Sequence, residues 1–335
     1  MAGRVAVLGA GCWGMALANL LDSGGNQVCL WEFDPAEYEK LLRHHGNPDR
    51  LRDFRLPETV DLTNDAAYAL EAAEFVILAT PSQHLRSVIS PLGDRLRRAR
   101  GIVNVAKGIE AGTLTRMSQV VTDECDVAPD RVGTLSGPSH AEEVILDMPT
   151  TVVAASSSEP LACETQRLFS VDNFRVYISQ DLVGVELGGS LKNIIAIAAG
   201  IADGLGLGDN TKGALITRGL AEITRLGVAM GAQVETFAGL SGIGDLVTTC
   251  MSGHSRNRLV GERIGRGQSL EHILSELKMV AEGVETTRSG LELARGLDVE
   301  MPITNEVYRV LFEGKSASEA VSDLMGRELK AEIWR

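Results

Sequence analysis

The sequence is poor in positive charge and in aromatic residues, and both shortages narrow the possible functions. Lysine and arginine number 32 against 45 aspartates and glutamates, so the net charge is −13, and aromatic residues make up 4% of the 335 residues. Proteins that bind nucleic acids or insert into anionic membranes present a basic face, so we expect neither as a partner. An anionic small molecule would have to be held by a local group of cations.

Cysteine is also sparse, and its pattern excludes two kinds of site. The chain contains no C-x-x-C pair, and its five cysteines are scattered: Cys12, Cys29, Cys125, Cys163 and Cys250. A disulfide framework or a zinc site is therefore not expected, and a reducing cytoplasm is the natural compartment. The six histidines show no metal-ligand spacing, and no G-x-S-x-G motif indicates a serine hydrolase.

Long apolar runs are few. Segment 5–21 approaches the ~20 residues of a membrane span, and with Arg4 before it and an A-L-A sequence near its end it resembles a signal peptide. We interpret it instead as a strand followed by a helix, because three glycines interrupt it and a second strand-like run, 28–31, follows directly. No other segment is expected to come close to spanning a membrane.

Glycine is the residue in excess. The chain has 36 glycines, above the usual ~7% of residues, which suits close packing of helices on strands and close approach of backbone to a ligand. No glycine period, internal repeat or low-complexity segment is visible, and 44% hydrophobic residues indicate a folded protein. The length exceeds what one hydrophobic core usually organises, so about two domains are expected.

The first half alternates strand-like and helical patterns. Segments of helical periodicity, such as 83–98 and 113–125, separate seven Val/Ile-rich runs that we expect to be strands: 4–8, 27–31, 75–79, 102–106, 132–135, 151–155 and 175–178. Continuous apolar strands separated by helices predict a parallel sheet covered on both faces, the doubly wound Rossmann-type α/β architecture.

The strand signal stops after residue 179. Segment 181–230 is rich in Ala, Gly, Ile and Leu, and 268–330 repeats helix-length amphipathic patterns. We therefore expect a dinucleotide-binding Rossmann-type domain over 1–180 and an all-helical substrate and catalytic domain over 181–335. Because no Pro- or Ser-rich linker separates them, the two are expected to share a large interface.

A glycine-rich motif follows the first expected strand. In Gly9-Ala10-Gly11-Cys12-Trp13-Gly14, Gly9 permits the tight turn, Gly11 lets the backbone reach a diphosphate, and Gly14 lets the helix pack on the strand. The alternative is an ordinary glycine-rich turn, but the position between a strand and a helix at the start of an α/β half favours dinucleotide binding.

The end of the second expected strand indicates which dinucleotide. Glu32 lies about 20 residues past the glycine motif, where an acidic residue accepts hydrogen bonds from the ribose hydroxyls of NAD. A 2′-phosphate would meet like charge there, and no arginine follows, since Phe33 and Asp34 are next. The alternative is a solvated loop carboxylate.

Two lysines and one aspartate stand out in apolar surroundings. Lys192 is the single charge from Gly188 to Ala202, and a lysine in a low-dielectric environment loses preference for its charged form, which suits proton exchange near neutral pH. Asp245 lies in a glycine-rich apolar run and needs a cationic partner, for which Lys192 is a candidate. Lys107 follows a strand and points into the crevice of a parallel sheet. Alternatively, both lysines reach solvent and serve no chemistry.

Residues 254–257 look like the start of a helix. Ser255, Arg256 and the backbone amides of that turn could hold a phosphate. The alternative is plain capping by Ser255 with a solvated Arg256.

The order and spacing of these motifs resemble NAD(P)-dependent glycerol-3-phosphate dehydrogenases of the soluble bacterial type over essentially the whole chain. The matching segments are GAGCWG with MALA after it, TPSQ (80–83), AKGIE (106–110), LSGPSHAEEV (135–144), the long stretch 186–219, GLSGIGDLVTTC around Asp245, and SRNR (255–258). The resemblance implies hydride transfer between a nicotinamide and C2 of dihydroxyacetone phosphate, giving sn-glycerol 3-phosphate for phospholipid synthesis.

The resemblance also implies roles for single residues. Lys192 matches the general acid/base, Lys107 lies at the boundary of substrate and cofactor, and Asp245 would orient Lys192 or a substrate hydroxyl. Substrate positions would be Lys107, Gly137, Ser139, Lys192, Asp245, Ser255, Arg256 and Asn257. Cofactor positions would be Gly9, Gly11, Cys12, Trp13, Gly14, Glu32, Phe33, Lys107, Ala141, Arg256, Val280 and Glu282. Closure of the helical domain over the sheet would exclude water, and the family suggests a cytoplasmic homodimer.

Two positions depart from the family pattern. Cys12 stands where relatives often have Ser or Asn, and Glu32-Phe33 stand where relatives that accept NADPH carry Gly and a basic residue. We therefore predict that NAD(H) is preferred and that NADP(H) remains possible.

Two other functions fit parts of the sequence. A 3-hydroxyacid or ketopantoate-type reductase shares the N-terminal pattern and a catalytic lysine but lacks the S-R-N phosphate turn. A dinucleotide-sensing binding protein would not need Lys107, Lys192 and Asp245 together, and all three are present.

Overall fold

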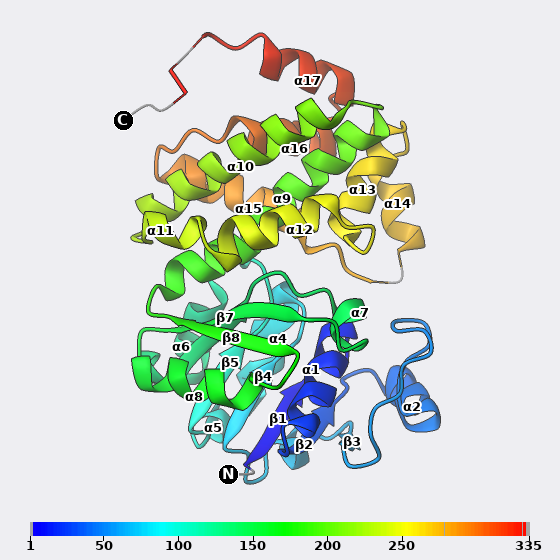
Figure 1. The fold of residues 1–335 in the computed structure, drawn as a ribbon, viewed down its shortest axis with the longest axis vertical. Coiled ribbons are helices and arrows are strands. Elements are labelled where there is room, and N and C mark those ends of the chain that lie inside the picture. The colour runs from blue at the N-terminus through cyan, green and yellow to red at the C-terminus, as the bar shows by residue number, and fades with distance from the viewer. Residues whose placement is uncertain (1–2, 278, 330, 333–335) are drawn as a thin grey trace.

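The computed structural model describes residues 3–277, 279–329 and 331–332. An eight-stranded sheet with helices on both faces forms one half of the molecule, and a set of packed helices forms the other (Figure 1). The strand order is β3-β2-β1-β4-β5-β6-β7-β8, with bounds β1 Arg4–Leu8, β2 Gln27–Trp31, β3 Asp61–Thr63, β4 Phe75–Leu78, β5 Gly101–Asn104, β6 Val132–Ser136, β7 Thr150–Ser156 and β8 Phe174–Ser179.

The central strand β1 explains why both faces of the sheet are covered. Val5 pairs with Val28 of β2 and with Phe75 of β4, both in parallel register. Successive side chains of a strand point to opposite faces, so Val5 and its alternate neighbours join one buried apolar cluster while Ala6 and Leu8 join another. The predicted doubly wound architecture is confirmed.

Helices α1 and α8 pack on one face of the sheet, and α4 and α6 pack on the other. The helices of this half are α1 Cys12–Ser23, α2 Pro35–His44, α3 Ala66–Ala69, α4 Leu85–Ile89, α5 Gly93–Leu96, α6 Met117–Cys125, α7 Ala141–Val144 and α8 Glu159–Phe169, with short 3₁₀ turns at Ser82–His84, Ser90–Leu92 and Pro129–Arg131.

Three details of this half differ from the expectation. The sheet is mixed, because β7 runs antiparallel to β6, and β8 runs parallel to β7. The connection from β6 to β7 carries only the four-residue helix α7, too little for the long crossover that joins parallel strands. Strand β3 was missed, and the single helix expected over 83–98 is broken near Pro91, whose ring cannot continue an α-helix.

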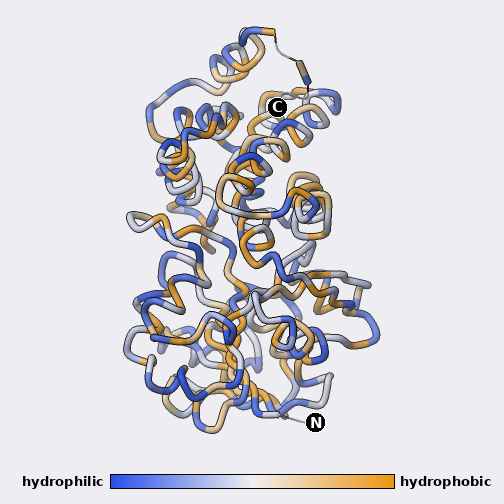
Figure 2. Tube along the Cα trace, turned by 90° about the vertical axis from the view of Figure 1, so that its left-hand side faces the viewer, coloured by the Kyte–Doolittle hydropathy of each residue, from blue (hydrophilic) through white to orange (hydrophobic). Residues whose placement is uncertain are grey.

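Every described element after β8 is a helix, as predicted. Helix α9, Leu182–Gly204, lies at the centre and packs against α10, α12, α13 and α15. The other helices are α10 Asp209–Ala229, α11 Val234–Phe237, α12 Asp245–Met251, α13 Arg256–Gly265, α14 Leu270–Glu276, α15 Glu282–Gly296, α16 Pro302–Phe312 and α17 Ala317–Met325, with a π turn at Leu240–Gly244 before α12. Hydrophilic and hydrophobic segments alternate along these helices (Figure 2), as expected for amphipathic helices around a shared core.

Helix α9 is also long and apolar enough to cross a membrane by length and composition, contrary to the expectation that no segment besides 5–21 would qualify. In the fold, 89% of its most apolar window is buried among the surrounding helices. Its backbone approaches α13 closely: a methyl group at Gly200 would overlap the carbonyl oxygen of Arg258, and one at Gly261 would overlap that of Ile197. The apolar character of α9 thus reflects its place in a protein core.

The first turns of α9 are fastened to the sheet half. Glu186 accepts hydrogen bonds from the backbone amide of Ser118 at 2.8 Å and from its hydroxyl at 2.6 Å, and it pairs with Arg116. One turn later, the Ser190 hydroxyl lies 3.2 Å from the carbonyl oxygen of Gly108. These contacts place the first part of α9 against α6 and against the segment that follows β5.

Candidate active site

The turn between β1 and α1 forms an open cradle. Gly9 has a φ of +114°, which L-residues rarely adopt, and a methyl group at Gly14 would overlap the Gly9 carbonyl oxygen. A methyl group at Gly11, in contrast, would meet nothing within 4 Å. Open space therefore lies above Gly11 at the N-terminus of the 12-residue helix α1, where backbone amides and the helix dipole favour an anion. These residues fit the diphosphate of a dinucleotide.

A pair of alanine substitutions separates the two roles of these glycines. Gly14→Ala should destabilise the fold by about 1–3 kcal/mol, because the added methyl group overlaps backbone. Gly11→Ala should leave the melting temperature nearly unchanged, since its methyl group meets no protein atom, yet weaken NADH binding by filling the cradle. Thermal denaturation and fluorescence titration with NADH measure the two effects, and unchanged NADH binding in Gly11→Ala would contradict the placement of the diphosphate.

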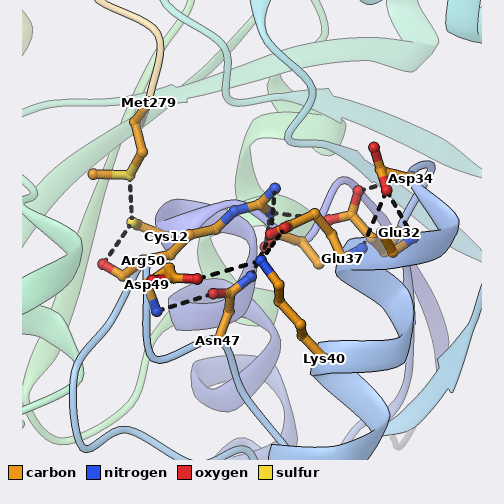
Figure 3. A network of polar contacts seen from close by, with 11 residues as sticks. Cys12, Glu32, Asp34, Glu37, Lys40, Asn47, Asp49, Arg50 and Met279 are labelled. Atoms are coloured by element: carbon orange, nitrogen blue, oxygen red, sulfur yellow. Dashed lines mark hydrogen bonds and ion pairs between the residues drawn. The ribbon is translucent and has the colours of Figure 1, made fainter. Parts of the chain in front are cut away.

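Glu32 does not stand alone at the end of β2. The residue is 7% exposed, and its carboxylate accepts hydrogen bonds from the Asp34 amide at 3.1 Å and from the Arg50 guanidinium at 2.9 Å (Figure 3). The interpretation of Glu32 as a solvated loop carboxylate is therefore wrong. No arginine follows Glu32 directly in the sequence, but Arg50 reaches it from the loop between α2 and β3.

The aromatic and sulfur-containing residues of the cofactor region lie around this cradle. Cys12 is buried, with its sulfur 3.3 Å from the Arg50 carbonyl oxygen and 3.2 Å from the Met279 sulfur. Burial raises the pKa of the Cys12 thiol, so it stays protonated at neutral pH. Trp13 packs near Phe174 with ring centroids 6.5 Å apart. Phe33 is 71% exposed, so it offers a free face beside Glu32.

A buried carboxylate joins the two predicted lysines. Asp245, at the start of α12, pairs with Lys107 at 2.8 Å through one oxygen and with Lys192 through the other. Lys107 follows β5 and Lys192 lies on α9, so the site forms where the two halves of the molecule meet. The predicted pairing of Asp245 with Lys192 is confirmed.

The protonation of these groups follows from their burial. Desolvation lowers the pKa of Lys192 to about 8, although the nearby Asp245 carboxylate acts in the opposite direction. Burial alone would raise the pKa of Asp245, but the attraction and hydrogen bonds of Lys107 and Lys192 outweigh it and hold that pKa below its ordinary value. The cluster thus contains an ionised carboxylate and a lysine able to exchange a proton near neutral pH.

Thr249 is a member of this cluster that the sequence reasoning missed. Its hydroxyl lies 2.6 Å from the Lys192 ammonium and 2.6 Å from the Asp245 backbone carbonyl. A signal was available, because Asp245 and Thr249 are four residues apart and share one face of a helix.

The loop after β6 closes one side of the cluster. The Gly137 carbonyl oxygen accepts hydrogen bonds from the Lys107 ammonium and from the Ser139 hydroxyl, both at 3.0 Å. His140 follows in this loop, and Ala141 begins α7. Burial, together with the positive charges of Lys192 and Lys107, lowers the pKa of His140 to about 4, so its imidazole is neutral at physiological pH.

The predicted helix start at residues 254–257 is confirmed as the beginning of α13. The Ser255 hydroxyl caps the helix by accepting from the Arg258 amide at 3.2 Å. The Asn257 side chain accepts from the Gly283 amide, and the Arg256 guanidinium donates to the Val280 carbonyl oxygen, each at 2.9 Å. Both parts of the alternative are thus confirmed: Ser255 caps the helix, and Arg256 is exposed to solvent while it contacts the segment before α15.

Glu282 ties that segment to the sheet half. Its carboxylate accepts from the Ser82 backbone amide at 2.9 Å, just after β4. The predicted residues therefore lie in three places. One group surrounds Lys107, Asp245 and Lys192, and a second lies along the carboxyl ends of β1 and β2. The third joins the start of α13 to the segment before α15.

Comparison with known proteins identifies the family. The N-terminal model of NAD-dependent glycerol-3-phosphate dehydrogenase matches residues 4–162, and the C-terminal model matches residues 181–322. The chain is 51% identical to the glycerol-3-phosphate dehydrogenase (NAD(P)+) 2 of Salinibacter ruber, over 100% of this chain and 97% of that protein. It is also 51% identical to the glycerol-3-phosphate dehydrogenase (NAD(P)+) of Geobacter sulfurreducens, over the full length of both.

Solved structures agree with this assignment. The crystal structure of glycerol-3-phosphate dehydrogenase from Coxiella burnetii superposes with a TM-score of 0.93 at 36% identity, over 97% of this chain and 99% of that one. A ketopantoate reductase from Ralstonia eutropha, at 15% identity and a TM-score of 0.62 over 95% and 99% of the two chains, shares the fold alone. The full-length matches and the arrangement of the described site together show that this chain belongs to the NAD-dependent glycerol-3-phosphate dehydrogenase family.

Proposed function

We propose that the chain is an NAD(P)-dependent oxidoreductase that interconverts dihydroxyacetone phosphate and sn-glycerol 3-phosphate, with NAD(H) preferred. The observation that carries the proposal is the buried cluster of Lys107, Asp245 and Lys192 between the sheet and the helices. It lies in a chain that matches glycerol-3-phosphate dehydrogenases from end to end.

Lys192 is the general acid in reduction. Gly9, Gly11 and Gly14 would hold the diphosphate of NAD(H), whose nicotinamide would supply the hydride for substrate C2. Lys192 gives its proton to the carbonyl oxygen of the substrate, and in oxidation the neutral amine takes the hydroxyl proton back. Asp245 and Thr249 fix the direction of the Lys192 ammonium, and Lys107 places a second positive charge beside the same carboxylate.

The remaining predicted residues hold the ligands. Arg256, Ser255 and the amides of the first turn of α13 bind the substrate phosphate, since a guanidinium and a helix N-terminus both favour phosphate oxygens. Asn257 keeps this turn against α15, and Gly137 and Ser139 form the wall next to Lys107. Cofactor contacts are supplied by Gly9, Gly11, Cys12, Trp13, Gly14, Glu32, Phe33, Lys107, Ala141, Arg256, Val280 and Glu282.

The purified protein tests the proposal directly. NADH should be oxidised rapidly when dihydroxyacetone phosphate is added and not when ketopantoate is added, because ketopantoate carries no phosphate for Arg256. With the pKa of Lys192 at about 8, kcat/KM for reduction should fall above that pH as the proton donor is lost. In the oxidation direction kcat/KM should rise toward the same pH, as the base becomes neutral.

Two outcomes would contradict the assignment. Turnover of ketopantoate as fast as that of dihydroxyacetone phosphate would show that Arg256 and the first turn of α13 do not select a phosphorylated substrate. If kcat/KM changed with pH in the same direction for reduction and for oxidation, Lys192 could not be the group that carries the proton.

The proposal extends to organisation and setting. Residues 1–180 hold the cofactor and residues 181–335 supply the acid/base and phosphate-binding groups. The enzyme is a cytoplasmic homodimer that provides glycerol phosphate for phospholipid synthesis. Light scattering after size-exclusion chromatography measures the number of chains per particle. Cell fractionation locates the protein. Tracing labelled glycerol in cells depleted of the protein follows its product into lipid.

A further inference from the structure

Arg50 is tied to the carboxylates that surround the ribose end of the proposed cofactor site. One of its guanidinium nitrogens donates to Glu32 at 2.9 Å and to the Ala10 carbonyl oxygen, within the glycine motif, at 2.7 Å. The other lies 3.3 Å from Glu37 of α2. Figure 3 shows the guanidinium between the two carboxylates, next to the turn that carries Cys12. A dinucleotide whose ribose lies against Glu32 therefore also contacts Arg50.

Hydrogen bonds and ion pairs from neighbouring side chains hold Glu37 in this arrangement. The Asn47 side chain donates to Glu37 at 2.6 Å, and Lys40 pairs with Glu37 at 2.7 Å and with Asp49 at 3.3 Å. The hydrogen bond from Lys40 is the largest of the effects that lower the pKa of Glu37, which keeps that carboxylate ionised. Arg50 is thus shared between two carboxylates and is not free to turn toward another anion.

The charges around the guanidinium determine what it can bind. The contacts join two cations, Lys40 and Arg50, to three carboxylates: Glu32, Glu37 and Asp49. A ribose hydroxyl can donate to Glu32 and accept from Arg50 without displacing either. A 2′-phosphate would have to take Arg50 from Glu32 while lying beside an unpaired carboxylate, which is unfavourable at this degree of burial.

We propose that Arg50 is positioned to anchor a 2′-phosphate but is kept from doing so by its ion pairs with Glu32 and Glu37. By occupying the guanidinium, these two carboxylates set the preference for NAD(H). Discrimination against NADP(H) then comes from competition for an arginine that is already in place, in addition to simple repulsion by Glu32. The inference rests on the proposed function in one respect, the location of the adenosine ribose at the end of β2. It predicts that removing one carboxylate charge makes the site bind a 2′-phosphate more tightly.

Adenosine 2′,5′-bisphosphate and 5′-AMP test this without turnover. Isothermal titration calorimetry of the full-length protein gives the ratio of their dissociation constants. In Glu32→Gln, which keeps the acceptor for the Asp34 amide, affinity for the bisphosphate relative to 5′-AMP should rise at least about tenfold, the effect of one charge-assisted hydrogen bond. Glu37→Gln should shift the ratio in the same direction by less. The matched control is Glu39→Gln, which removes an exposed charge from the same helix without touching Arg50.

The double variant Glu32→Gln/Arg50→Gln shows whether Arg50 binds the 2′-phosphate or whether Glu32 merely repels it. If Arg50 binds the 2′-phosphate, the gain of Glu32→Gln is lost in the double variant. A gain that persists there, or no gain in Glu32→Gln while its melting temperature is native, overturns the proposal. If neither probe binds the wild-type protein or any variant, the ribose location and the proposed dinucleotide site fail together. NADH-dependent turnover with an unchanged binding ratio would overturn the role of Arg50 alone.

Discussion

Replacing Lys192 by methionine should lower kcat for reduction of dihydroxyacetone phosphate at least about a hundredfold, the usual loss when a positioned acid/base is removed. Methionine keeps much of the side-chain volume inside α9 but cannot donate a proton. Binding of NADH should change little, because Lys192 lies beside Asp245 and Thr249 and not along the glycine cradle. Steady-state kinetics and fluorescence titration with NADH measure the two quantities.

Stability gives the same variant an independent readout. Lys192 has a pKa of about 8 in the fold, against about 10.4 in an unfolded chain. Between these values the unfolded chain binds more protons, so the contribution of Lys192 to the free energy of unfolding rises with pH. Below pH 8 Lys192 is charged in the fold, so its full destabilising effect on the free energy of unfolding is present. Lys192→Met should lack this rise when unfolding by urea is compared across that range.

The control for Lys192→Met is a lysine in a similar setting outside the site. Lys315 is 9% exposed and pairs with Glu306 and Asp323 between α16 and α17. Lys315→Met should lose stability and keep kcat within a few-fold. Native turnover in Lys192→Met, or an equal loss of kcat in both variants, would refute the acid/base role.

The second large effect concerns Asp245. Asp245→Asn removes the carboxylate that two lysines share, and breaking a buried ion pair from one side typically costs about 3–5 kcal/mol. Lys107 and Lys192 would then face each other without compensation, so the pKa of Lys192 should fall further and the proton donor should be largely lost at neutral pH. We expect both a lower free energy of unfolding and a lower kcat for reduction.

Acid titration identifies the origin of the lost stability. Because the pKa of Asp245 is lowered in the fold, its favourable contribution is present above the unfolded value of about 3.9 and disappears as the pH falls through the folded value. The difference between wild type and Asp245→Asn should therefore shrink in acid. Asp203 bridges Lys212 and Arg258 in a comparable way, so Asp203→Asn is the control. A kcat as low in Asp203→Asn as in Asp245→Asn would contradict a specific role.

Much of the fold could be predicted because its signals are local. Val- and Ile-rich runs predicted seven of the strands, and the glycine spacing after β1 predicted the cradle. The pairing of Lys192 with Asp245 was also predictable, because a lone charge in an apolar helix and a lone carboxylate in an apolar loop each require a partner. These inferences need no knowledge of how distant segments approach one another.

The remaining features depend on tertiary geometry. The direction of β7 follows from the short path after β6, which residue patterns do not specify, and the three residues of β3 carry too little signal. Arg50 is the instructive case. It is 18 residues from Glu32, in an irregular segment with no period, so nothing in the neighbouring residues indicates that it pairs with Glu32. A specificity prediction made from the residues next to Glu32 alone was therefore incomplete.

The attachment of α9 bears on which parts can move together. Glu186 and Ser190 bind this helix to α6 and to the backbone after β5, and Lys192 lies within one turn of Ser190. By sequence Lys192 belongs to the helical half, yet mechanically it is anchored to the sheet. A rotation between the two halves would thus leave Lys192 stationary relative to Lys107, and the first turn of α13 would stay with them, because α13 packs closely against α9.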